Sequence, residues 1–162
     1  MTTDHLLPRA PTTAKLLTAL RQRFDPILVG DAAVPLTPEK VAARAPYAVL
    51  IPLWTRLDGP PFGNARHADA QWVYQLSLYG LRGDQLEGMR DKAIAVVLGK
   101  GADGYTVDLD TADGDQHNGQ PITEPVKITE RTLDDDAGMG EAVGSVLPLD
   151  LRFRLFATPA TG

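Results

Sequence analysis

One glycine pattern in the chain has the spacing of a nucleotide-binding loop. Gly99, Gly101 and Gly104 form a GxGxxG sequence. In a dinucleotide-binding fold these glycines follow a strand and open a helix, whose N-terminus meets the pyrophosphate. Here the preceding residues 84–98 have helical periodicity and the following residues 105–109 have strand character. Because this context is reversed, we interpret the pattern as a turn that ends a helix, and we expect no cofactor.

The aspartates of residues 108–115 have the composition of a calcium-binding loop. An EF-hand needs oxygen ligands at positions 1, 3 and 5, a glycine at position 6 and a glutamate at position 12. Counted from Asp108, position 5 is Ala112, position 6 is Asp113 and position 12 is Gly119. The register therefore fails, and we expect an exposed acidic turn without a metal ion.

The residue sets of nucleophilic and zinc-dependent catalysis are also missing. Ser77 and Ser145 are the only serines, and neither lies in a GxSxG sequence. The histidines His5, His67 and His117 show no i, i+4 pair and no HExxH sequence, and the chain has no cysteine. We therefore expect that the protein is not an enzyme.

The composition is that of one ordinary globular domain spanning residues 1–162, with 43% hydrophobic and 23% charged residues. No apolar run reaches the roughly 20 residues of a membrane span, and residues 1–11 lack the apolar core of a signal peptide. Residues 1–100 carry a net charge of +3 and residues 101–162 a net charge of −8. Because phosphate contacts need clustered cations, sequence-specific DNA binding is disfavoured.

Periodicity predicts a helix after Pro11, capped by Thr12 or Thr13 and ended by Asp25-Pro26. Residues 26–46 are expected to be irregular, with a possible short helix at 38–43. Residues 47–54 are apolar on both faces and predict a strand, which Pro52 places at a sheet edge or brings to its end. Alternation predicts another strand over residues 69–79.

The second half of the chain begins with the clearest helix, residues 84–98, with Asp84 as N-cap and Gly99 just past its end. Short strands are expected at residues 105–109 and around 126–128, separated by polar turns. The aspartates at 134–136, with the glycines that follow, predict a mobile loop. Strict alternation over residues 147–155 predicts the strongest strand, with one solvated face.

Residues 55–68 connect two predicted strands by 14 residues, whereas a hairpin loop normally has two to five. We interpret this loop as a contact arm with Phe62 at its tip; a disordered surface loop is the alternative. We interpret the charge cluster formed by Arg66, His67 and Asp69 as an anchor for the loop or a contact with a partner. The candidate subunit-interface residues are Arg56, Asp58, Phe62 and Arg66.

Several segments together resemble the tail terminator proteins of long-tailed phages, which are also called tail completion or tail-to-head joining proteins. The resemblance is strongest to those of phages with actinobacterial hosts. It covers residues 12–100 and 147–159, and residues 101–146 have no match. The segments that carry it are PYAVLIPL (46–53), DGPPFG (58–63), ADAQWVYQLSLYG (68–80), DQLEGMRDKA (84–93) and FRLFATP (153–159).

The resemblance implies an α+β fold, with a small mixed or mainly antiparallel sheet backed by two helices. It further implies a hexameric ring that caps the tail tube, stops its polymerisation and joins the head connector. The expected partners are copies of the chain, the tail tube protein and a head completion or connector protein, with DNA passing non-specifically and no membrane.

Residues 101–146 are then an irregular acidic insertion, whose aspartates are candidates for an acidic channel or partner surface. These aspartates are Asp108, Asp110, Asp113 and Asp115. The expected location is the virion, after assembly in the host cytoplasm. The alternatives are another neck component or, from a different class, a small host enzyme or ligand-binding domain.

Overall fold

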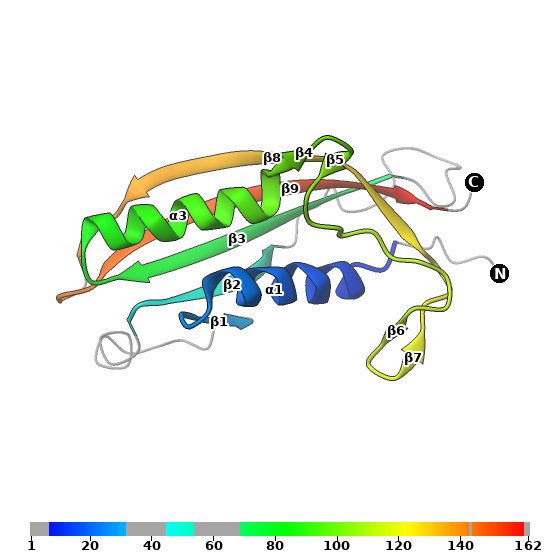
Figure 1. Ribbon diagram of the computed structural model, residues 1–162, viewed down its shortest axis with the longest axis horizontal. Coiled ribbons are helices and arrows are strands. Elements are labelled where there is room, and N and C mark those ends of the chain that lie inside the picture. The colour runs from blue at the N-terminus through cyan, green and yellow to red at the C-terminus, as the bar shows by residue number, and fades with distance from the viewer. Residues whose placement is uncertain (1–6, 32–44, 54–68, 143, 161–162) are drawn as a thin grey trace.

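The computed structural model describes residues 7–31, 45–53, 69–142 and 144–160. These residues form an α+β fold in which a five-stranded sheet lies behind two helices that cover the same face (Figure 1). The sheet is mainly antiparallel. The fold class expected from the sequence is therefore confirmed.

The strand order of the sheet is β1–β2–β3–β9–β8, and only the β1–β2 pair is parallel. The long central strands β3 and β9 pair over eleven residues, from Ala70 with Ala157 to Gly80 with Leu147. The bounds of the strands are Leu28–Asp31 for β1, Tyr47–Leu53 for β2, Ala70–Gly80 for β3, Val126–Met139 for β8 and Leu147–Pro159 for β9.

Alternation along these strands sorts their side chains between the two faces. On β3, Trp72, Tyr74, Leu76 and Leu78 are all buried under the helices, as the sequence predicts. Their register partners on β9 include Leu149, Leu151, Phe153 and Leu155, which are also buried. The opposite, open face carries the charged residues of β9, so the prediction of one solvated face is also confirmed.

Helix α1 spans Ala10–Phe24 and helix α3 spans Gly83–Leu98. Each buries an apolar stripe on the sheet. The predicted N-caps are wrong, because α1 begins before Thr12 and α3 begins before Asp84, whereas Asp25 and Gly99 do follow the last helical residues as predicted. The buried residues are Leu16, Leu17, Leu20 and Phe24 of α1 and Leu86, Met89, Ala93, Val96 and Val97 of α3.

Between α3 and β8 the chain forms two small ribbons. The first pairs β4 (Lys100–Gly101) with β5 (Gly104–Tyr105), so the GxGxxG sequence does end a helix and turn the chain back. The second pairs β6 (Gln116–His117) with β7 (Gln120–Pro121) and projects away from the sheet beyond α1 (Figure 1). Its turn residues Asn118 and Gly119 both have positive φ, as a type I′ hairpin turn requires.

Three sequence predictions are wrong. Residues 28–31, expected to be irregular, form β1. Of the strand expected at 105–109, only Tyr105 lies in a strand, the two-residue β5. The aspartates at 134–136, expected in a mobile loop, belong to β8, which continues to Met139 through three register shifts. Within the expected irregular acidic insertion, residues 126–139 therefore form a regular strand. The helix considered at 38–43 lies outside the described residues.

The sequence predicts that the strand with Pro52 either lies at a sheet edge or ends near Pro52. The second alternative is confirmed. Strand β2 lies between β1 and β3, so it is internal at first. However, β1 pairs only as far as Leu50, and β2 ends at Leu53. Pro52 therefore lies beyond the end of β1, where its missing N–H breaks no pairing with that strand.

Candidate interaction surfaces

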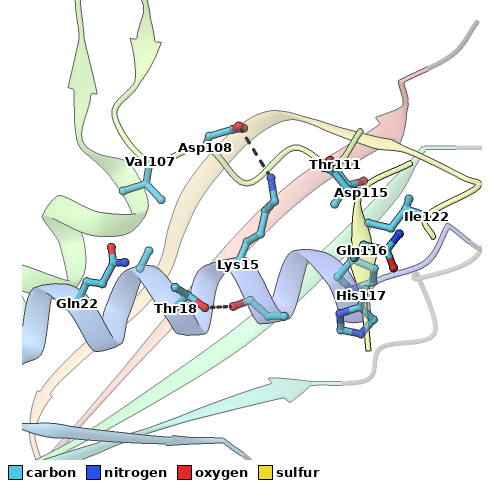
Figure 2. A pocket seen from close by; sticks show the side chains of 13 residues that line it. Lys15, Thr18, Gln22, Val107, Asp108, Thr111, Asp115, Gln116, His117 and Ile122 are labelled. Carbon is cyan, nitrogen blue, oxygen red and sulfur yellow. Dashed lines mark hydrogen bonds and ion pairs between the residues drawn. The ribbon is translucent and has the colours of Figure 1, made fainter. Parts of the chain in front are cut away.

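The acidic segment 107–122 runs beside α1 and encloses a groove of about 580 Å³ with it (Figure 2). Helix α1 contributes one face of small and polar side chains, including Ala14, Thr18 and Gln22. The segment contributes the polar residues Asp108, Asp115 and His117 and the apolar residues Val107 and Ile122. Two of the four predicted acidic residues therefore line this groove.

Lys15 fastens the acidic segment to α1. Its Nζ lies 4.0 Å from Oδ2 of Asp108 and also donates to the backbone carbonyl of Asp110. Figure 2 shows the lysine reaching from the helix to the aspartate. The side chain of Asp108 remains 76% exposed, so the attraction between these charges is weakened by solvent. The chief effect of Lys15 is to fix the course of the segment.

Asp110 differs from the neighbouring aspartates, because its carboxylate accepts a hydrogen bond from the backbone of the sheet. Its Oδ1 accepts the backbone N–H of Ile128 at 2.8 Å, and Oγ1 of Thr111 accepts the N–H of Val126 at 2.8 Å. Further along, the Tyr105 hydroxyl accepts the N–H of Arg131 at 3.0 Å. Side chains of residues 105–111 thus cap the outer edge of the first half of β8, a common way to protect an edge strand.

The remaining two aspartates lie at the turn before the β6–β7 ribbon. Oδ2 of Asp115 accepts a hydrogen bond from the N–H of Ala112 at 3.0 Å. The backbone carbonyl of Asp115 accepts one from the N–H of Ile122 at 2.6 Å. Asp113 is exposed. The structure therefore places all four predicted acidic residues along one segment, with Asp108, Asp113 and Asp115 exposed and Asp110 bonded to the sheet. The predicted interface residues Arg56, Asp58, Phe62 and Arg66 lie outside the described residues.

A second groove of about 680 Å³ continues from the first towards the C-terminal end of α1. The two share Ala19, Gln22 and Val107, and the second adds Arg23 and Lys100. One end of the combined groove is therefore basic, and the other is acidic.

Arg131 is a buried cation that the sequence analysis missed. Its Nη1 donates to the carbonyl of Val97 at 3.2 Å and its Nη2 to the carbonyl of Val107 at 2.6 Å, while its guanidinium lies 4.2 Å from the ring centre of Tyr105. Burial lowers the pKa of Arg131, and the nearby Tyr105, Asp110 and Asp108 oppose this effect. The sequence gives no direct signal of its burial: the alternation of Val126 and Ile128 would continue to Glu130, and a register shift between Ile128 and Glu130 buries Arg131 instead.

Tyr105 and Glu130 complete this contact. The Tyr105 hydroxyl donates to Oε1 of Glu130 at 2.8 Å. Burial raises the pKa of Tyr105, and the hydrogen bond to Glu130 adds to the rise. The same hydrogen bond lowers the pKa of Glu130. These shifts arise at a structural junction of α3, β5 and β8 that lies outside the grooves.

The open face of the sheet is crossed by a polar network. Arg154 donates through Nε to Asp134 at 2.7 Å and through Nη1 to Gln71 at 2.7 Å, which links β8, β9 and β3. On the helix-covered side, Arg90 of α3 pairs with Asp136. Two of the three neighbouring aspartates of β8 are therefore held by arginines.

Among the described residues there is no cluster of three or more potential metal ligands, and neither helix is long and apolar enough to cross a membrane. No protein-family model matches the chain, and a search of curated proteins finds no significant match.

Proposed function

We propose that this protein is a structural virion component, a ring-forming tail terminator of a long-tailed phage. In this role it caps the tail tube, stops its polymerisation and joins the tail to the head. The observation that carries the proposal is a one-sided sheet, covered by α1 and α3 on one face, whose edge strands β1 and β8 have no further described strand beside them. This agrees with the architecture that the resemblance implies.

The distribution of charge supports the same role. Acidic residues of the second half of the chain lie on the 103–115 segment beside α1 and on the edge strand β8, whereas the opposite edge of the sheet is formed by β1. A subunit whose two sides differ in charge suits a ring that must present one surface to the tube and another to the head. An acidic channel surface would also repel DNA phosphates and leave the passage non-adhesive.

An enzyme or ligand-binding domain receives less support from the grooves. An active site brings together polar groups that are free to meet a substrate. Here Lys15 is engaged by Asp108 and Asp110, and Asp115 bonds its own turn. Catalytic activity is therefore no part of the proposal.

The proposal is tested by removing the gene from the phage and examining the particles by electron microscopy. A terminator predicts tails of abnormal length that are not attached to filled heads. Tails of normal length that fail to join heads would assign the protein to a neighbouring neck component. Normal, infectious virions would refute a structural role altogether.

A further inference from the structure

The outer edge of β8 is capped in its first half and open in its second. Up to Arg131, side chains from residues 105–111 bond its outward N–H groups. The register continues without a shift from Arg131 to Leu133, so the backbone groups of Leu133 point outward as those of Arg131 do. Within the described structure, no side chain or loop bonds this outward side over residues 132–136. Bulges flank Asp135 and keep the open stretch short.

At the opposite edge of the sheet, no other described strand pairs with the outer side of β1. Strand β1 has four residues. Among the described residues, Arg21 is the only one whose side chain bonds the backbone of β1, because its Nε donates to the carbonyl of Val29. Leu28 is 74% exposed, the most exposed large apolar residue of the described chain. An exposed leucine on an edge strand that no described strand covers is typical of a strand that pairs with another chain.

The directions of the two edges are complementary. Strand β1 is parallel to β2, and three successive antiparallel pairs connect β2 to β8. Strand β8 therefore runs opposite to β1. A neighbour related by rotation about an axis along the strands would present its β1 antiparallel to β8. Antiparallel pairing is the more stable arrangement.

Charge opposes the alternative in which two β8 edges pair with each other. That arrangement would bring Asp134, Asp135 and Asp136 of two copies together, and like charges across paired strands are destabilising. The surroundings of β1 are less acidic: Arg21 of α1 bonds the carbonyl of Val29, and the aspartates close to the strand in the chain are Asp25 and Asp31. The β8 edge therefore favours a β1 edge over a second β8 edge.

We propose that β1 of one copy pairs antiparallel with residues 132–136 of the next copy, so that the sheets continue from subunit to subunit. This contact is heterologous and can close into a ring. The inference rests on the proposed function for its self-assembly, and it names the surface that each subunit uses. It also explains why only half of the β8 edge is capped by side chains.

The test uses cysteine cross-linking, because the chain contains no cysteine of its own. Register places Leu28 and Asp135 on the open face, at opposite edges of the sheet. Four strand spacings, roughly 19 Å, separate them within one copy. A disulfide spans Cα atoms at most about 7 Å apart, so it can form only between copies. The double variant Leu28→Cys/Asp135→Cys should give a ladder of cross-linked oligomers after oxidation on a non-reducing gel.

A second double variant, Gly30→Cys/Asp135→Cys, allows for a pairing shifted by two residues. A side chain at Gly30 would meet only the Ala48 carbonyl, at 3.9 Å. Each single variant serves as a control. The protein is oxidised at about 1 mM, where a contact with a millimolar Kd is substantially occupied. Cross-linked dimers of Asp135→Cys alone would show that β8 pairs with β8 and overturn the inference.

Absence of a ladder from both double variants would overturn it as well. These results are separate from a failure of the proposed function. Rings without cross-links would refute the β1–β8 contact and leave the terminator role intact. A ladder in a protein whose loss leaves normal virions would retain the contact and refute that role.

Discussion

At the scale of single residues, two buried arginines fasten the chain around the sheet. Arg9 donates to the carbonyl of Leu53 at 2.8 Å and to that of Val73, and it lies 4.3 Å from the ring centre of Tyr74. Arg131 makes the same kind of contact around Tyr105. Each guanidinium joins two backbone segments and covers an aromatic ring, which suits its planar shape and fixed donors.

Replacing Arg131 with alanine should lower the free energy of unfolding by about 3 kcal/mol, because two carbonyl oxygens lose a charged donor in a buried place. Urea unfolding followed by circular dichroism measures the loss. Arg152→Ala is the matched control on the neighbouring strand, since Arg152 is exposed. The control should change the stability by less than about 0.5 kcal/mol. Equal effects of the two variants would contradict the role of Arg131.

The ion pair between Arg90 and Asp136 predicts a specific dependence on pH. The hydrogen bond from Arg90 lowers the pKa of Asp136 in the folded protein. The group therefore stabilises the fold above its unfolded pKa of about 3.9, and this contribution is lost as the pH falls through the lower, folded value.

Asp136→Asn should thus be less stable than the native chain near pH 7, by no more than about 1 kcal/mol because the pair is partly exposed. The difference should shrink below about pH 4. Thermal unfolding at several pH values measures it. Asp135→Asn is the control, because the side chain of Asp135 forms no hydrogen bond or ion pair with a described residue. A difference that stays constant with pH would contradict the assignment.

At the scale of elements, α3 ends where the chain passes very close to its own last turn. Gly99 has φ −58, so its role does not come from left-handed backbone. A Cβ at this position would lie 2.2 Å from the carbonyl oxygen of Ala95. Gly88, on the exposed side of the same helix, would have nothing within 4 Å of an added Cβ.

Two glycine substitutions in this helix should therefore act in opposite directions. Gly99→Ala should destabilise the protein by about 2–3 kcal/mol, because backbone must move to relieve the overlap. Gly88→Ala should stabilise it by about 0.5–1 kcal/mol through lower backbone entropy in the unfolded chain. Paired thermal unfolding measurements compare them. If Gly99→Ala were as stable as Gly88→Ala, the close approach would be wrong.

Elements with strong periodicity were predictable from the sequence, and those fixed by distant contacts were not. The apolar stripe of α3 and the alternation along β3 and β9 indicate directly in the sequence which side chains are buried. The aspartates at 134–136 resemble a loop because their place in a strand depends on Arg154 and Arg90, far away in the chain. The exposed β1 has too few residues to show a period.

The candidate surfaces follow the same rule. The sequence identified the aspartates of 108–115 as a group, because they are close in the chain. It did not reveal that Asp110 bonds β8 or that Lys15 holds the segment, since both contacts join residues far apart. The hydroxyls expected to cap α1 are likewise used elsewhere: Thr12 donates to Leu109 and Thr13 bonds the Tyr74 hydroxyl.

At the scale of the whole molecule, the described ends of the long connection between β2 and β3 are firmly held. Leu53 pairs with Val73, and Arg9 donates to the carbonyl oxygens of both residues. Ala70 is paired with Ala157 on the other side. The fold of the subunit therefore does not need the connection to be long, which agrees with its interpretation as an arm for another chain.

Shortening residues 55–68 to a four-residue linker should leave the stability of the subunit within about 1 kcal/mol, because loop closure depends only weakly on length. Self-association should weaken, because the arm with Phe62 would be lost. Urea unfolding measures the first quantity and sedimentation at high protein concentration the second. Phe62→Ala is a milder variant that keeps the length of the loop and removes only its aromatic side chain. If both variants associate as the native chain does, residues 55–68 make no contribution to self-association, and assembly depends on the sheet edges alone.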